Sequence, residues 1–83
     1  MLHLFRKHTQ GIVITDTDTD EQHTITLIRY TRHFCEVRID DAVKIFVPND
    51  TFYIGLCKVV ILKIDRGVKF GLDASRHIKI EKN

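Results

Sequence analysis

Apolar and polar side chains alternate with a period of two residues through most of this chain, and this limits it to β-structure. β-branched and aromatic residues recur at every second position in short segments, and each segment is bounded by polar or turn-forming residues. Such alternation is typical of strands that have one buried face. No segment has sustained helical periodicity. We therefore expect a small all-β fold, an antiparallel sheet or barrel-like domain, with about eight or nine strands.

The expected strands are separated by clear turn signals. The sharpest are Asp40-Asp41, Pro48-Asn49-Asp50 and Asp65-Arg66-Gly67, since Pro cannot continue a central strand and Asn, Asp and Gly favour turns. The polar stretch 16–22 is predicted to be a longer loop. We expect strands at residues 2–7, 12–15, 24–30, 35–39, 43–47, 51–54, 58–64, 68–72 and 77–81.

The length and composition are those of one compact domain spanning residues 1–83. A hydrophobic share of 43% and a charged share of 29% are ordinary for a globular protein and argue against disorder. No apolar run approaches the roughly 20 residues that a membrane-spanning helix needs. The first seven residues turn charged before any apolar stretch of signal-peptide length. We expect a cytoplasmic protein with no membrane partner.

The sequence contains no motif for catalysis, a cofactor or a metal. Cys35 and Cys57 have no CxxC spacing and are expected to be buried thiols, and the five histidines form no HxH or HxxxH pair. The series Asp16, Asp18, Asp20 is similar to the start of a calcium loop but lacks the later Gly and Glu, so we expect a solvated loop. The protein is therefore predicted not to be an enzyme.

Charge and aromatic residues give a weaker signal. The net charge is +2, but four acidic residues lie between positions 16 and 21, so the rest of the chain carries 13 basic against 7 acidic side chains. This asymmetry hints at a polyanionic partner. Tyr30, Phe34 and Tyr53 could stack on bases, although core packing or cross-strand pairing is the preferred interpretation.

The sequence pattern on one side of Pro48 is similar to the pattern on the other side. On each side a short strand, a long strand, a turn and a further strand follow one another, and each half contains an Asp-Ala pair, at Asp41 and at Asp73. Residues 11–48 and 51–82 are thus candidates for an internal duplication. β-patterns resemble one another easily, so an unrelated insertion between the first strand and the rest of the chain stays open.

Two segments resemble one known family. The opening Met1-Leu2-His3-Leu4-Phe5-Arg6-Lys7 is similar to the Met-Leu-x-Leu-x-Arg-Lys/Arg start of the carbon storage regulator (CsrA/RsmA) family. The later half is similar to the rest of that family's core, through an Ile-Gly pair, a Val-Lys-Phe-Gly-Leu-Asp-Ala run and a final Ile-Lys-Ile. Residues 1–7 and 51–82 together span nearly one family length. Ser75 stands where the family has Pro, and Lys82 where it has Arg.

The resemblance implies a fold, a function and a site. In the family the first and last strands cross into a partner's sheet, and RNA with a GGA loop binds where the first strand of one subunit meets the last strand of the other. Carried over, it implies RNA contacts at Leu4, Arg6, Lys7, Ile80 and Lys82. Arg6 and Lys7 would neutralise phosphates and donate to guanine edges. A charged edge strand that blocks aggregation is the alternative interpretation of the two cations.

We therefore expect an RNA-binding translational regulator whose partner is an mRNA leader or a small RNA. One alternative is a degenerate relative that pairs with a true CsrA and antagonises it. Another is a small β-rich ribonuclease or toxin. If residues 8–50 are an insertion, a homodimer with exchanged strands follows, and this is the preferred interpretation. If residues 11–48 are a first copy, the chain is a monomeric pseudo-dimer whose first strand pairs with its own last strand.

Overall fold

Nine β-strands and no helix make up the computed structural model, which describes residues 1–83. Every strand that the alternation predicts is present, and no strand end differs by more than two residues. The prediction of an all-β domain is confirmed. The strands are β1 (Leu2–Arg6), β2 (Gly11–Asp16), β3 (Gln22–Tyr30), β4 (Cys35–Ile39), β5 (Ala42–Phe46), β6 (Thr51–Ile54), β7 (Cys57–Ile64), β8 (Val68–Asp73) and β9 (Ile78–Lys82).

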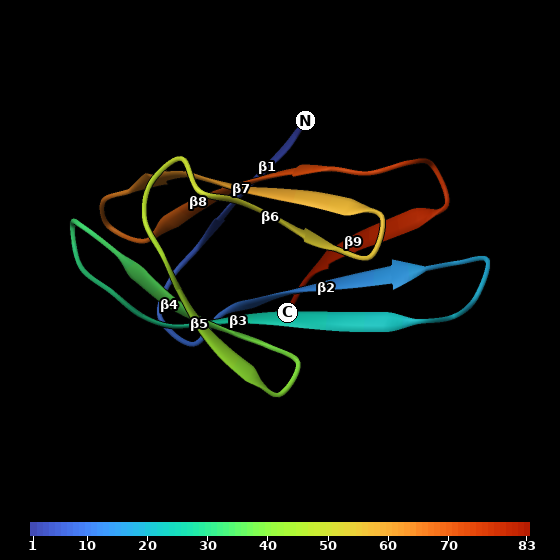
Figure 1. Ribbon diagram of the computed structural model, residues 1–83, viewed down its shortest axis with the longest axis horizontal. Coiled ribbons are helices and arrows are strands. Elements are labelled where there is room, and N and C mark those ends of the chain that lie inside the picture. Colours follow the sequence, from blue (N-terminus) through green and yellow to red (C-terminus); the bar gives the residue numbers. More distant parts are fainter.

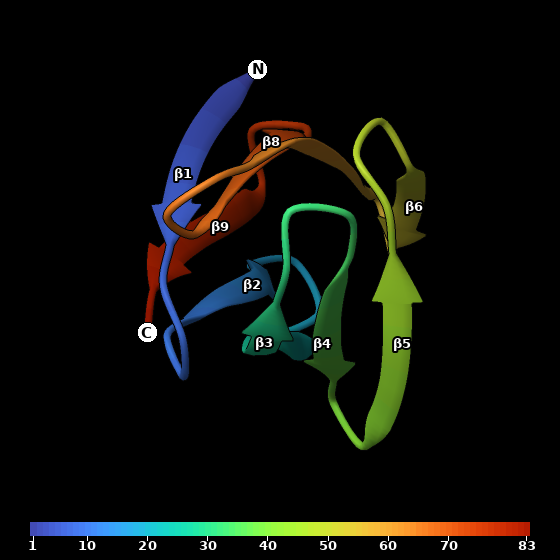
Figure 2. The same ribbon diagram turned by 90° about the vertical axis from the view of Figure 1, so that its left-hand side faces the viewer.

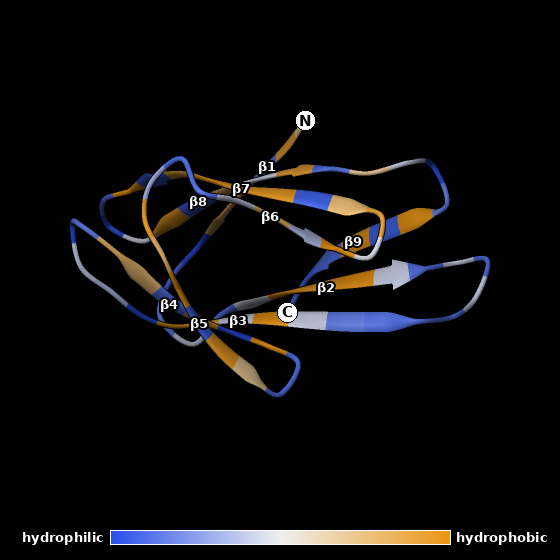
Figure 3. Ribbon diagram, in the orientation of Figure 1, coloured by the Kyte–Doolittle hydropathy of each residue, from blue (hydrophilic) through white to orange (hydrophobic).

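The strands form two antiparallel sheets that pack face to face. One sheet has the order β1-β8-β7-β6 and the other the order β5-β4-β3-β2-β9, and the two layers are visible in Figures 1 and 2. The side chains that alternate inward form the core, while Figure 3 shows hydrophilic residues in most of the connecting loops. The core consists of Ile12, Ile14, Ile25, Leu27, Cys35, Val37, Ile54, Cys57, Val59, Ile61, Ile64, Val68, Phe70 and Leu72.

Each sheet is built around a three-stranded meander, β2-β3-β4 in one and β6-β7-β8 in the other. In both meanders the middle strand has a β-bulge against the third strand. The extra residue is Ile28 in β3 and Leu62 in β7, and each lies two residues before the end of its strand. A bulge fixes the register and the local twist of its hairpin. The two meanders therefore repeat one another in strand order and in the position of the bulge.

The outer strands of the two sheets come from opposite ends of the chain. β1 precedes the first meander but pairs with β8 of the second, and β9 follows the second meander but pairs with β2 of the first. The alternative in which the first strand pairs with the last strand of the same chain is therefore wrong. The physical reason is packing against different layers: β1 places Leu4 opposite buried Phe70, whereas β9 places Ile80 opposite buried Ile14.

β5 completes the five-stranded sheet on its other edge, where it pairs with β4. A short turn over residues 47–50 then carries the chain to β6 in the opposite layer. In this turn the Asp50 carboxylate accepts a hydrogen bond of 2.8 Å from the backbone N–H of Val47. The rings of Phe46 and Phe52 stack with centroids 4.2 Å apart, which ties the two strands together. No helix of the length and apolarity needed to cross a bilayer occurs in the structure.

Candidate nucleic-acid interface

The first strand presents two of the predicted contact residues on one face. Leu4 lies opposite Phe70 and Arg6 opposite Val68, so both point towards the space between the sheets. Leu4 packs against the core and is half-buried. Arg6 lies at the rim of the same space, and its Nε atom donates a hydrogen bond of 2.7 Å to the Phe5 carbonyl oxygen. Lys7 follows the end of the strand and is exposed.

The last strand presents the other two residues in the same way. Ile80 lies opposite Ile14 and Lys82 opposite Ile12, so this pair also points towards the space between the sheets. Ile80 packs against the core, whereas Lys82 is exposed at the end of the strand. Both strands therefore combine an apolar residue on the core with a cation at the rim.

Gly11 holds the ends of these two strands near one another. Its backbone exchanges two hydrogen bonds with Asn83, of 2.8 and 2.9 Å, directly after the turn that follows β1. A Cβ atom at Gly11 would lie 2.6 Å from the Ile25 carbonyl oxygen, so a larger residue does not fit here. Figure 2 shows β1 and β9 along the same side of the sandwich. The structure thus brings the ends that carry Arg6 and Lys82 to one region.

None of the three predicted cations forms an ion pair. The ion pairs of the structure involve the N-terminal amine and the residues His23, Arg29, His77 and Lys79. The charges of Arg6, Lys7 and Lys82 are therefore available to a ligand. Exposed cations without carboxylate partners are the groups that would neutralise phosphates.

The same region contains three further basic residues that sequence reasoning missed. Lys63 and Lys69 lie directly opposite one another on β7 and β8, and Lys69 lies opposite Phe5 of β1, so both lysines are on the outer face of the four-stranded sheet, whereas Arg6 points to its inner face. Like charges in opposed positions of a sheet repel one another, and neither lysine has a carboxylate partner. Arg66 belongs to the turn between these strands. No local pattern near Arg6 indicates the three residues, because only the pairing of β1 with β8 brings them together.

That turn is held tightly against the end of β1. Gly67 has a φ of 153°, a conformation that side chains rarely tolerate. A Cβ atom there would lie 2.6 Å from the Arg6 carbonyl oxygen and 2.7 Å from the Phe5 ring. The glycine therefore lets the β7–β8 turn approach the backbone of Arg6, and it sets the position of Arg66 relative to Arg6.

Charge is segregated between the two ends of the long axis. In Figure 1 the connections 7–10, 31–34 and 65–67 lie towards the left-hand end, and the loop 17–21 and the turn 74–77 lie at the right. The left-hand connections carry Lys7, His8, Arg32, His33 and Arg66 against the single acid Asp65. At the right-hand end the loop 17–21 contains the three acids Asp18, Asp20 and Glu21, and the turn 74–77 contains Arg76 and His77, so this end is the more acidic of the two. A polyanion is therefore favoured at the end where β1 terminates.

Known proteins give no further guidance to this surface. The chain matches no protein-family model, no curated protein and no solved structure.

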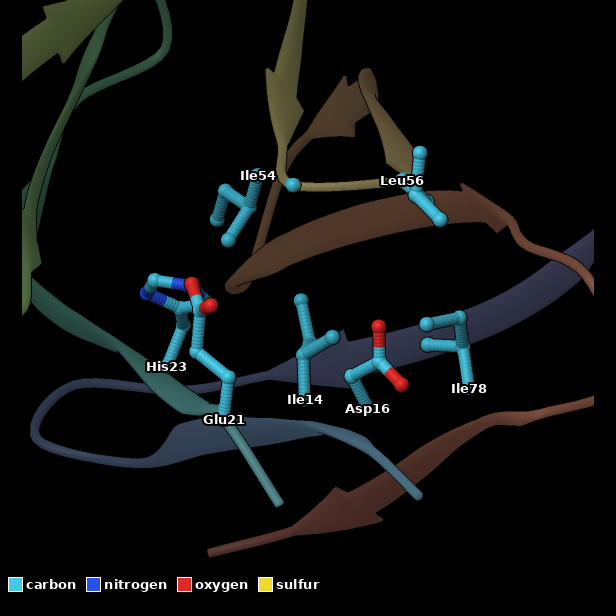
Figure 4. A pocket seen from close by; sticks show the side chains of 8 residues that line it. Ile14, Asp16, Glu21, His23, Ile54, Leu56 and Ile78 are labelled. Carbon is cyan, nitrogen blue, oxygen red and sulfur yellow. The ribbon is translucent and has the colours of Figure 1, made fainter. Parts of the chain in front are cut away.

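The opposite end of the sandwich has a pocket of about 310 Å³. Ile14, Ile54 and Ile78 line it together with two carboxylates, that of Glu21 beside the His23 ring and that of Asp16 between Ile14 and Ile78 (Figure 4). Two carboxylates disfavour a phosphate ligand here. The pocket is lined by Ile14, Asp16, Glu21, His23, Ile54, Gly55, Leu56 and Ile78.

His23 lies between two carboxylates at this acidic end. Its Nδ1 is 2.7 Å from Oδ2 of Asp40, and its Nε2 is 2.7 Å from Oε1 of Glu21. The hydrogen bond to Asp40, supported by Glu21, raises the pKa of His23 above its ordinary value. The hydrogen bonds from His23 and from the backbone N–H of Thr24 lower the pKa of Asp40. The contact of His23 with Asp40 therefore joins the start of β3 to the end of β4.

The acidic loop itself is organised by Asp16. Its Oδ1 accepts hydrogen bonds from the backbone N–H groups of Asp18, at 2.9 Å, and Thr19, at 3.4 Å. This is an Asx-type turn, in which a side chain replaces a backbone acceptor. Oδ2 of the same carboxylate lies 3.8 Å from His77 Nε2. Ligand atoms of Asp16, Asp18 and His77 lie within 4.8 Å of one another.

The cysteines and aromatic residues occupy the places expected of them, with one exception. Cys35 and Cys57 are fully buried, and burial raises the pKa of the Cys35 thiol to about 11. Tyr30 packs against the core. Phe34 is half-buried and lies under the Arg29 guanidinium, 5.5 Å from its ring centroid. Tyr53 differs, because it is 69% exposed on β6.

Proposed function

We propose that this protein binds single-stranded RNA on the side of the sandwich where β1 and β9 lie, near the ends of both strands, and that it regulates translation through this contact. The observation that carries the proposal is the gathering of basic side chains without carboxylate partners around the end of β1. Arg6 and Lys82 lie on the two terminal strands, Lys7 directly follows β1, and Lys63, Arg66 and Lys69 belong to the adjoining hairpin.

The chemistry of this surface suits an unpaired RNA loop. The guanidinium of Arg6 can form paired hydrogen bonds to a phosphate or to a guanine edge, and the lysines neutralise further phosphates. β1 and β9 are edge strands, so half of their backbone groups are free to bond to the edges of unstacked bases. Leu4 and Ile80 provide an apolar surface next to the cations.

The sequence resemblance supports the same site. In the carbon storage regulator family, RNA binds where a first strand and a last strand from exchanged sheets meet. In this chain the first strand extends the second meander and the last strand extends the first meander. Because each chain has one β1 and one β9, the proposal requires one RNA site per chain.

The test is a gel-shift titration with an RNA hairpin that has GGA in its loop, beside the same hairpin with a scrambled loop. We expect the GGA hairpin to bind more tightly and to saturate at one RNA per chain. Equal affinity for the two hairpins would show that the protein does not recognise the GGA sequence of the loop. No binding would favour the protein antagonist, and shortened RNA would favour a ribonuclease.

A further inference from the structure

The four edge strands of the two sheets differ in how they are protected against pairing with another chain. Edge strands are usually short, charged, bulged or covered, because their free backbone groups are templates for a further strand. β6 has four residues, β9 carries Lys79 and Glu81 on its outward face, and β1 ends in Arg6. β5 carries one charge, Lys44, on its inward face, and its outward face has none of these features.

The outward face of β5 is aliphatic and exposed. Ala42, Lys44 and Phe46 lie opposite the inward-facing residues of β4, so Val43 and Ile45 point away from the core. Val43, Ile45 and the following Val47 are 51%, 61% and 46% exposed. β5 pairs with β4 without a register shift and therefore has no bulge to bend its edge away. Figure 3 shows this strand as largely hydrophobic at the rim of the molecule.

We propose that two copies of this chain associate through antiparallel pairing of their β5 strands, with Ile45 opposite Ile45 of the second copy. The five-stranded sheets of both copies then become one continuous sheet. A second copy is the occupant that the edge itself specifies, because an antiparallel pair of identical strands is self-complementary about a two-fold axis.

The register follows from charge and side-chain size. Centring the pair on Lys44 would place two ammonium groups directly opposite one another, which is unfavourable. Centring it on Ile45 places Lys44 opposite Phe46 and Val43 opposite Val47 of the second copy. The aliphatic side chains of both strands then form one patch on the outer face of the joined sheet.

This association leaves the proposed RNA site free. β5 and β9 are the two opposite edges of the five-stranded sheet, and Figure 2 shows β5 on the far side from β1 and β9. The dimer therefore carries two separate RNA sites. It differs from strand exchange, because β1 and β9 keep their partners within their own chain.

Disulfide trapping tests the register. Cys35 and Cys57 are fully buried, so Ile45→Cys introduces the one accessible thiol. We expect Ile45→Cys to form a disulfide-linked dimer under mild oxidation, since opposed residues have Cα atoms about 4.5–5.5 Å apart. Val43→Cys is the matched control: its counterpart in the second copy lies about 13 Å away along the strand, which is too far for a bond. Failure of Ile45→Cys to cross-link, or equal cross-linking of both variants, overturns the proposal.

Sedimentation equilibrium from about 10 µM to about 1 mM tests the association without a thiol. We expect a monomer–dimer equilibrium for the natural chain and a monomer for Ile45→Lys at every concentration, because the two lysines would face one another. Tyr53→Lys is the control, since it places a charge at an equally exposed position on the edge strand of the other sheet. A natural chain that stays monomeric, or a Tyr53→Lys variant that loses the dimer equally, contradicts the β5 pairing.

Discussion

At the scale of single residues, Arg6 is the most direct test of the RNA site. It lies at the rim between the sheets and has no acidic partner, so Arg6→Ala removes no ion pair of the folded chain. We expect the free energy of RNA binding to weaken by about 1–3 kcal/mol and the free energy of unfolding to change by only about 0.5 kcal/mol. Binding titrations and thermal melts measure the two effects.

Arg38→Ala is the matched control for Arg6→Ala. Arg38 is exposed on the outer face of the five-stranded sheet, away from the terminal strands, and its loss should leave RNA affinity nearly unchanged. If both variants weaken binding equally, the contact is a general effect of net charge. If Arg6→Ala lowers the melting temperature strongly, Arg6 stabilises the fold, and the loss of RNA binding cannot be assigned to a lost RNA contact.

His23 gives the protein a pH dependence whose direction follows from its partners. Because the folded pKa of His23 is raised above 6.5, its stabilisation is fully present below that value and is lost as the pH rises through the folded pKa. The pKa of Asp40 is lowered below 3.8, so its stabilisation is lost as the pH falls through that lower value.

The two groups therefore contribute most to stability between about pH 4 and pH 6.5. We expect the melting temperature of the natural chain to fall from mildly acidic to alkaline pH more steeply than that of His23→Gln. Melts of both proteins across this range provide the comparison. Parallel curves would show that the contacts of His23 with Asp40 and Glu21 contribute no stability in solution.

At the scale of elements, the position of β1 depends on the close approach of Gly67. In Gly67→Ala, the new Cβ would meet the Arg6 carbonyl oxygen and the Phe5 ring in a backbone conformation that disfavours side chains. We expect a loss of about 1–3 kcal/mol in the free energy of unfolding, with faster amide exchange along β1 and weaker RNA binding.

Gly55→Ala is the comparison for Gly67→Ala. Gly55 also has a positive φ, of 56°, but nothing lies within 4 Å of its added Cβ atom. We expect Gly55→Ala to lower the free energy of unfolding by about 1–2 kcal/mol, from backbone strain alone. The protection of β1 against amide exchange and the affinity for RNA should stay unchanged. Equal loss of β1 protection in the two variants would show that Gly67 does not position this strand.

At the scale of the whole molecule, the segregation of charge predicts a steep salt dependence. Single-stranded nucleic acids lose affinity with a slope of about 0.7 per phosphate contact when log affinity is plotted against log salt. Contacts by Arg6, Lys7 and Lys82 alone give a slope of magnitude about 2, and the addition of Lys63, Arg66 and Lys69 raises it to about 4.

The slope measured in titrations at several salt concentrations therefore gives the number of cations that contact RNA phosphates. The double substitution of Lys63 and Lys69 by Gln should lower the slope by roughly 1.4 if both contact phosphates. An affinity that does not change with salt would point to an apolar protein partner in place of RNA.

The sequence by itself determined the strands, most of the turns and the face that each side chain occupies. Alternation is a local property: whether Leu4 and Arg6 share a face depends only on their spacing of two residues. The two cysteines were expected to be buried because a free thiol behaves as a small hydrophobe, and the structure buries both. Leu4 and Ile80 were predicted only as RNA contacts, and the structure packs both against the core. The turns at Asp40, Pro48 and Gly67 were equally readable, because each depends on the conformational preference of one or two residues.

Only the tertiary structure decided which strands are neighbours. A period-two pattern says that one face is buried but does not say against which strand or in which register, so it could not place β1 beside β8 or β9 beside β2. The grouping of Lys63, Arg66 and Lys69 beside Arg6 follows from the pairing of β1 with β8. The pairings of β1 and β9 join residues about sixty to seventy positions apart, and no local preference encodes such contacts. The exposed edge of β5 is likewise a property of the sheet order, since no strand pairs on its other side.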